Sequence, residues 1–86
     1  MKFIYTKGFQ KSFEKLSPKQ QSQVENTLKK FALDPLNIML KNHALHGKLT
    51  GFRAIKAAND LRIVFREEQG YIFVVLINVG THNQIY

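Results

Sequence analysis

The sequence contains no cysteine, no tryptophan and no apolar run long enough to cross a membrane. The missing cysteine excludes a disulfide framework and a thiolate metal site. The first five residues, MKFIY, lack the apolar stretch of a signal peptide. Together these absences predict a cytoplasmic protein without a membrane segment.

Motifs for several enzyme classes are absent as well. There is no glycine-rich phosphate loop, no H-E-x-x-H and no G-x-S-x-G, so nothing indicates a P-loop NTPase, a zinc protease or a serine hydrolase. The chain has 86 residues, 44% of them hydrophobic, and we expect one small domain over residues 1–86. A core of that size leaves little room for a cofactor, and we expect none.

Acidic residues are scarce. The chain has six Asp and Glu against 13 Lys and Arg, which gives a net charge of +7. Residues 1–33 carry seven Lys and two Glu, so most of the excess positive charge lies in the N-terminal part. This bias predicts a polyanion or an acidic protein as a partner.

Two helices are predicted in the N-terminal half. After Thr6, which can cap a helix, apolar residues recur at helical spacing: Phe9, Phe13 and Leu16. Residues 17–20 have the pattern of a capping box with proline in the first turn, and the helix that they start is expected to end near Leu33. Asp34-Pro35 then stops it. The two helices would form an αα-hairpin.

The other predicted elements are β-strands. The β-type runs are Lys2–Tyr5, Phe52–Ala57, Leu61–Arg66 and Tyr71–Val79. The last three follow one another as an antiparallel meander, with residues 67–70 as a hairpin turn and Gly70 at a position suited to positive φ. The fold class is therefore α+β: an N-terminal strand and an αα-hairpin packed on a twisted, mainly antiparallel sheet.

Side chains alternate along the run Leu61–Arg66. Leu61, Ile63 and Phe65 share one face, which we expect to meet the helices. Arg62 then points to the opposite, open face of the sheet. This places a cation on a surface that no predicted helix covers.

The residues left for chemistry are Lys, Arg, His and Tyr in the C-terminal half. This set suits cleavage of RNA by its own 2′-hydroxyl group. That reaction needs a deprotonated nucleophile, stabilisation of the negatively charged phosphorane and a protonated 5′-oxygen. Histidine can transfer the protons near neutral pH, Arg or Lys can stabilise the charge, and tyrosine can stack on a base.

Four segments stand out together: L-x-G-x-L-x-G-F-R over residues 45–53, Ile55-Lys56, N-D-L-R-I-V-F over residues 59–65, and V-G-T-H-x-x-I-Y over residues 79–86. This combination resembles the RelE/ParE superfamily of toxins from bacterial type II toxin–antitoxin systems. The tail and the position of His43 are most similar to the YafQ-like branch. The resemblance implies a small α+β toxin that binds the ribosomal A site, cuts mRNA there without a metal and is neutralised by an antitoxin.

Carried over by position, the resemblance implies a catalytic set. Arg62 corresponds to the strand arginine that stabilises the cleaved phosphate, and His82 to the tail histidine, which we expect to be the main proton-transfer group. Lys56 falls where RelE proteins have a lysine and YafQ proteins a histidine, so we expect it to stabilise charge. Tyr86 matches the terminal aromatic residue, and His43 matches a histidine ahead of the residue 45–53 motif.

Further residues are expected to contact RNA or to depart from the family. The predicted RNA contacts are Arg53, Lys41, Lys48 and Asp60, with Arg53 open to pairing with Asp60 or with a helix carboxylate instead. Leu61 stands where YafQ proteins have a tryptophan. His46 matches no family residue, and we expect it to be structural or exposed.

Two other functions stay open. One is a ParE-like toxin that inhibits DNA gyrase by binding, against which the histidine and aromatic tail argues. The other is a catalytically inactive member that only binds its antitoxin, which the residues at Lys56 and Leu61 allow. For the main hypothesis the expected partners are a cognate antitoxin with an acidic amphipathic segment, the ribosome, mRNA and, through the antitoxin complex, operator DNA.

Overall fold

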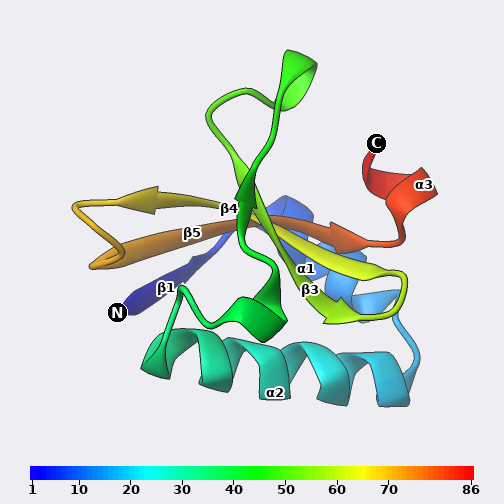
Figure 1. The fold of residues 1–86 in the computed structure, drawn as a ribbon. Coiled ribbons are helices and arrows are strands. Elements are labelled where there is room, and N and C mark those ends of the chain that lie inside the picture. Colours follow the sequence, from blue (N-terminus) through cyan, green and yellow to red (C-terminus); the bar gives the residue numbers. More distant parts are fainter.

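A five-stranded sheet with the strand order β1-β5-β4-β3-β2 organises the chain, and the computed structural model describes residues 1–86 (Figure 1). Its strands are β1 (Lys2–Tyr5), β2 (His43–Ala44), β3 (Arg53–Ala58), β4 (Leu61–Glu68) and β5 (Phe73–Gly80). β1 pairs parallel with β5, and every other pair is antiparallel. The predicted α+β fold class is confirmed.

Both predicted helices form where their caps are. Thr6 accepts a hydrogen bond from the Phe9 N–H at the start of α1 (Lys7–Glu14), and Ser17 and Gln20 make the reciprocal capping box of α2 (Pro18–Leu33). The short helical elements are η1 (Ile38–Leu40), η2 (Gly47–Leu49) and α3 (His82–Ile85). No helix here combines the length and the hydrophobicity that crossing a bilayer requires.

Helices α1 and α2 lie on one side of the sheet, while η2 and α3 project from the other side (Figure 1). The main core fills the helix side, where Phe9, Val24 and Phe31 meet the predicted strand residues Leu61, Ile63 and Phe65. Apolar alternation in β4 therefore sets which face is covered, as predicted. Arg62 is left on the open face.

The predicted strand boundaries are wrong at the β4–β5 turn. Glu67 and Glu68 belong to β4, and the turn falls later, at residues 69–72. Three consecutive residues there, Gln69, Gly70 and Tyr71, have positive φ values of 55°, 63° and 70°, which a strand does not allow. Gly70 has the predicted positive φ, but Tyr71 is not in a strand. Its ring instead packs on Phe31 and Phe65 of the core.

Two further elements differ from the prediction. The segment 34–50 contributes the edge strand β2, whose two residues are too few to show an alternating pattern. The polar tail, for which no secondary structure was predicted, forms α3, because Thr81 and Gln84 make a second capping box. Both elements lie beside the open face and border the same groove.

Candidate functional site

A groove of about 380 Å³ opens on the uncovered side of the sheet. Its walls come from β2 and the residues after it, from β4 and from α3, which are far apart in the sequence. The lining residues are His43, Ala44, Leu45, His46, Arg62, His82 and Tyr86. All three histidines of the chain therefore line one groove together with Arg62.

The floor of the groove is apolar. A small buried cluster of Leu45, Ala54 and Val64 forms on the open face, and Ile85 of α3 packs against it. This packing fixes β2, β3 and α3 relative to one another. Polar groups of the groove thus stand on a rigid apolar base, which favours a preorganised site.

Arg62 is held by one end of its guanidinium group. Its Nη1 donates to the carbonyl oxygens of Ala58, Asn59 and Leu61 at 2.9, 3.2 and 3.2 Å. The N–H groups of Nε and Nη2 have no acceptor in the protein, so they can donate hydrogen bonds to an anion in the groove. Gly80 is the β5 residue opposite Arg62, so no side chain from that strand covers the guanidinium.

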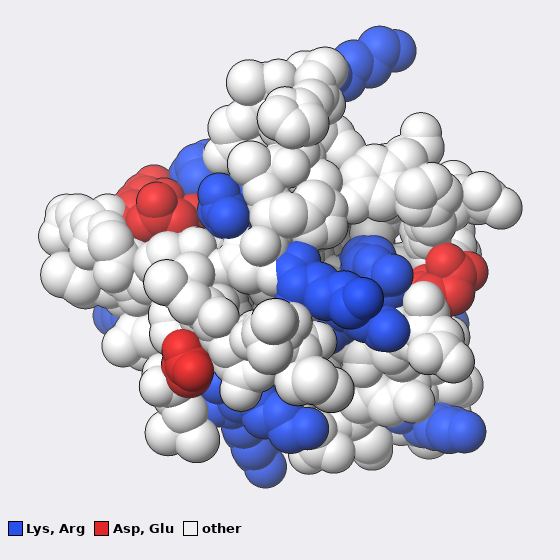
Figure 2. All heavy atoms as spheres, viewed as in Figure 1, with Lys and Arg blue, Asp and Glu red and all other residues white.

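Lys56 lies directly across from Arg62 on β3. The two cations share the open face of the antiparallel pair, where like charges repel each other. Neither forms a salt bridge, since the single salt bridge of the chain joins Arg66 to Glu68. Figure 2 shows Lys and Arg atoms gathered over the β3–β4 hairpin, below the space between the η2 loop and α3. Lys56 thus adds positive charge beside the groove without lining it.

The tautomer of His43 is fixed by its surroundings. Its Nδ1 lies 2.8 Å from the carbonyl oxygen of Lys41, which can only accept a hydrogen bond. Nδ1 therefore carries a hydrogen, and in the neutral ring Nε2 is the free acceptor. Lys41 presents this carbonyl from a left-handed backbone conformation with φ 51° at the end of η1.

Helix α3 carries the other aromatic groups of the groove. The rings of His82 and Tyr86 lie one turn apart, with centroids 4.6 Å from each other. The Thr81–Gln84 capping box closes the helix start, and the Oδ1 of Asp60 accepts a hydrogen bond from the His82 N–H at 3.3 Å. Asp60 thus ties α3 to the β3–β4 turn, and its contact with RNA stays a prediction.

Arg53 does not lie in the groove. It faces the helix side of the sheet, where its Nε donates to Asn42 at 2.8 Å and Asn42 donates to the Tyr71 hydroxyl at 3.0 Å. Pairing of Arg53 with Asp60 or a helix carboxylate is not observed. Arg53 therefore braces the connector after α2.

The two predicted lysine contacts, Lys41 and Lys48, are exposed on the connector and do not line the groove. His46 does line the groove, although it matches no residue of the family pattern. No local pattern points to this position, because Leu45 before it is held on the open face by Ala54 and Val64, which are distant in the sequence.

Chemically, the groove offers hydrogen-bond donors to an anion, imidazoles for proton transfer and an aromatic ring for stacking. The chain has no group of three or more His, Cys, Asp or Glu side chains placed to hold a metal ion. These are the groups expected for a phosphodiester, whose oxygens accept from Arg and whose bases stack on aromatic rings.

Comparison with known proteins identifies the family. The family model of the bacterial toxin of type II toxin–antitoxin systems, YafQ, matches residues 1–86. Among curated proteins, no sequence is similar enough to this chain to count as a match.

Solved structures share the fold over nearly the whole chain. YafQ from Escherichia coli strain BL21(DE3) is 18% identical, with 98% of this chain and 96% of that chain covered and a TM-score of 0.80. A conserved hypothetical protein from Helicobacter pylori is 26% identical, with 100% and 99% covered and a TM-score of 0.78. In the E. coli DinJ–YafQ toxin–antitoxin complex the matching chain is 19% identical, with 98% and 94% covered and a TM-score of 0.77. With its groove, its fold and the full-length family match, this chain belongs to the YafQ family of toxins from bacterial type II toxin–antitoxin systems.

Proposed function

We propose that this chain is an endoribonuclease that cuts mRNA in the ribosomal A site, stops translation and is neutralised by a cognate antitoxin. The observation that carries the proposal is the free side of the Arg62 guanidinium, which opens into a groove lined by three histidines and a tyrosine. Lys56 lies opposite Arg62 with no carboxylate partner. This excess of positive charge suits a phosphodiester.

The proposed reaction uses the RNA 2′-hydroxyl as nucleophile. Its oxygen forms a bond to phosphorus while the bond from phosphorus to the 5′-oxygen breaks, which leaves a 2′,3′-cyclic phosphate and a 5′-hydroxyl. Arg62 donates hydrogen bonds to the phosphorane oxygens, and Lys56 adds electrostatic stabilisation. Both charges act most strongly when the extra negative charge develops in the transition state.

Proton transfer falls to the histidines. His82 has no hydrogen-bonded ring nitrogen, so it is free to give a proton to the 5′-oxygen or take one from the 2′-hydroxyl. His43 is oriented by Lys41 so that Nε2 is its available nitrogen. Tyr86, half exposed beside His82, offers a face on which a base can stack.

In this proposal the ribosome positions the mRNA, which the groove alone does not do. The groove is shallow and no strongly buried base sits in it, so mRNA positioning by the ribosomal A site would align the 2′-hydroxyl with the scissile bond. The antitoxin partner is supported by the DinJ–YafQ complex, a relative of this chain in which a toxin is bound to an antitoxin. Contact with operator DNA would then be made through that complex.

The test is induced expression of wild type, Arg62→Ala, Arg62→Lys and His82→Ala, with primer extension on cellular mRNA. Arg66→Ala is the matched control, because it removes an arginine from the same strand but outside the groove. We expect cleavage to fall about 10²–10³-fold in the three groove variants and to persist in the control. Arg62→Lys should fail because a lysine cannot anchor to the turn and donate to the phosphate at once.

Two other results would replace this proposal. Full toxicity in all variants with intact mRNA and damaged DNA would favour inhibition of gyrase by binding. No growth arrest by the folded wild type would indicate an inactive member that only binds its antitoxin. Circular dichroism on each purified variant separates these results from loss of folding.

A further inference from the structure

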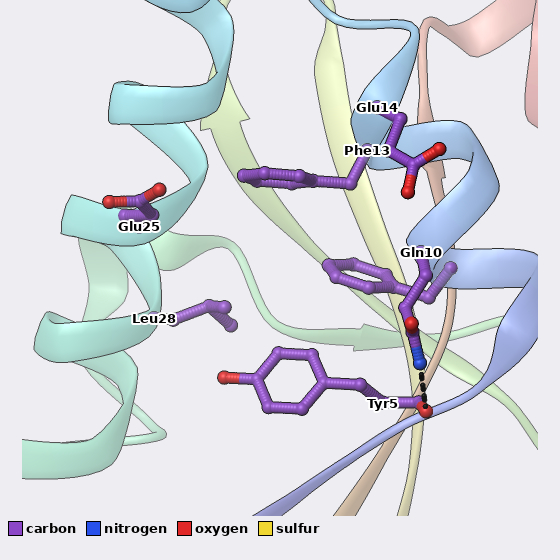
Figure 3. Close-up of a pocket in the computed structure, with 7 residues that line it drawn as sticks. Tyr5, Gln10, Phe13, Glu14, Glu25 and Leu28 are labelled. Atoms are coloured by element: carbon purple, nitrogen blue, oxygen red, sulfur yellow. Dashed lines mark hydrogen bonds between the residues drawn. The ribbon is translucent and has the colours of Figure 1, made fainter.

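A second groove lies on the helix side of the molecule, far from the histidines. It has a volume of about 380 Å³ and is bounded by β1, α1 and α2. Figure 3 shows Phe13 reaching from α1 toward α2, Leu28 reaching from α2, and the Tyr5 ring closing the end at β1. Phe9 forms its base.

The groove exists because the two helices pack mainly on the sheet, and the hydrogen bond from Gln21 to the Phe13 carbonyl joins them only at one end. Helix α1 packs along β5, while α2 packs over β3, two strands away in the sheet order. The gap between the helices stays open to solvent above Phe9, which is buried at its base. Tyr5 is 50% exposed there, which is unusual for a side chain whose ring packs on two phenylalanines.

The charged residues at the rim of this groove include two glutamates, although the molecule as a whole is positively charged. Glu14 on α1 and Glu25 on α2 border the groove from its two sides. Neither carboxylate takes part in the chain's single salt bridge. Two of six acidic residues thus flank one apolar groove on a chain with a net charge of +7. A ligand that brings apolar surface and positive charge together therefore complements this groove better than RNA does.

We propose that this groove binds a segment of the antitoxin in which an apolar side chain is flanked by Lys or Arg. The groove proposal rests on the proposed function in one respect, because it requires that the chain has an antitoxin. The apolar side chain would lie against Phe9, Phe13 and Leu28, and the cations would pair with Glu14 and Glu25. Such an apolar anchor ringed by charge is typical of the residues that dominate binding energy.

The groove continues toward the end of α2. A neighbouring cavity of about 290 Å³ shares Tyr5, Glu25 and Leu28 and adds Phe3, Lys29 and Ala32. The α2 residues of this trough recur at helical spacing, so they form one unpartnered face of the helix. Lys29 follows Glu25 by one turn, which predicts an acidic residue next in the antitoxin segment after its basic one. The groove thus favours an antitoxin segment with a basic residue followed by an acidic one, and not a segment that is acidic throughout.

The test measures binding by isothermal titration calorimetry. The ligand is the protein encoded by the reading frame adjoining that of this chain, in full-length form. The variants are Glu14→Lys, Glu25→Lys and Tyr5→Ser, and Glu68→Lys is the control with the same change of charge on β4. We expect each groove variant to weaken binding at least tenfold, and the control to stay within twofold. High salt should shrink the effect of the two charge reversals and leave that of Tyr5→Ser.

A benzophenone crosslinker placed at Tyr5 gives an independent readout. We expect a photo-crosslink to the antitoxin that excess unlabelled toxin suppresses. A crosslink to a second copy of this chain, or unchanged affinity in Glu14→Lys and Glu25→Lys, would overturn the groove proposal while leaving the toxin proposal intact. No binding of the adjoining protein to wild type would overturn the groove proposal and the antitoxin part of the proposed function, while the mRNA-cleavage part is decided separately by primer extension.

Discussion

At the scale of single residues, the pair of Lys56 and Arg62 defines the open face. They are cross-strand neighbours, and cross-strand Cβ atoms lie about 4.5–5.5 Å apart in antiparallel sheets. No carboxylate forms a salt bridge with either of them. The fold therefore tolerates a repulsion that an anionic ligand would relieve, as expected of a binding site and not of a structural pair.

The repulsion leads to a prediction for Lys56→Gln. Removing one of the two facing cations should raise the free energy of unfolding by about 0.5 kcal/mol, because like charges opposite one another destabilise a strand pair. The same change should weaken RNA cleavage. Urea denaturation at low ionic strength measures the first effect.

Lys48→Gln is the control for that measurement, since it removes an exposed lysine of η2, outside every strand pair. Its free energy of unfolding should match wild type. If Lys56→Gln were destabilised, or if high salt did not abolish its gain, the two cations would not be repelling each other.

At the scale of elements, α3 is the least self-sufficient part of the fold. Its four residues include none that is buried, and so short a helix does not form alone in water. It is held by the Thr81–Gln84 capping box, by the contact of Asp60 with the His82 N–H and by Ile85 on the apolar floor. The element that carries His82 and Tyr86 thus depends on three local contacts.

Gly80→Ala tests that dependence. A Cβ added at Gly80 would lie 2.7 Å from the Oε1 of Gln84, which must then leave the N–H of Thr81. We expect α3 to shift and cleavage to fall about 10²-fold, while the melting temperature stays close to wild type because α3 buries no residue. Thermal denaturation and the cleavage assay measure the two effects.

The double variant Gly80→Ala with Gln84→Ala separates the two causes. It removes the 2.7 Å contact with Oε1 but also the hydrogen bond of that oxygen with the Thr81 N–H, so activity should recover only in part. Complete recovery would mean that the capping box does not position α3. A large loss of melting temperature in Gly80→Ala alone would contradict the view that α3 is peripheral to the core.

At the scale of the whole molecule, charge and apolar surface divide the protein into two sides. The open side carries Arg62, Lys56 and the histidines, and the helix side carries the groove between Glu14 and Glu25. Over the whole chain, 13 Lys and Arg outnumber six Asp and Glu, which gives the net charge of +7. The two proposed binding sites therefore lie on separate sides of the molecule.

This division predicts the salt dependence of RNA binding. For single-stranded RNA, the slope of log K against log salt is about −0.7 for each phosphate contact. Lys56→Gln should make the slope less negative by about 0.7, because one phosphate contact is lost. Lys19→Gln on the helix side should leave the slope unchanged. Fluorescence anisotropy with a short labelled RNA measures both, and equal slopes in the two variants would remove Lys56 from the site.

The fold was largely predictable from local patterns. The Ser17 capping box and the alternation of Leu61, Ile63 and Phe65 depend on neighbours in the sequence, so they placed α2 and the covered face correctly. The turn after β4 was misplaced because the apolar Tyr71 reads as a strand residue. Its positive φ is stabilised by contacts with Phe31 and Phe65 that no local pattern shows.

The candidate site was predictable only in part. The sequence by itself determined the open-face position of Arg62, because side-chain alternation and the burial of its neighbours leave no other choice. It also determined the helix caps and the excess of positive charge. Only the tertiary structure decided that His46 joins the groove, that Arg53 turns to the helix side and that Asp60 holds α3. These placements depend on how β2, the β3–β4 turn and the C-terminal helix pack together, and packing between distant segments has no signature in any one of them.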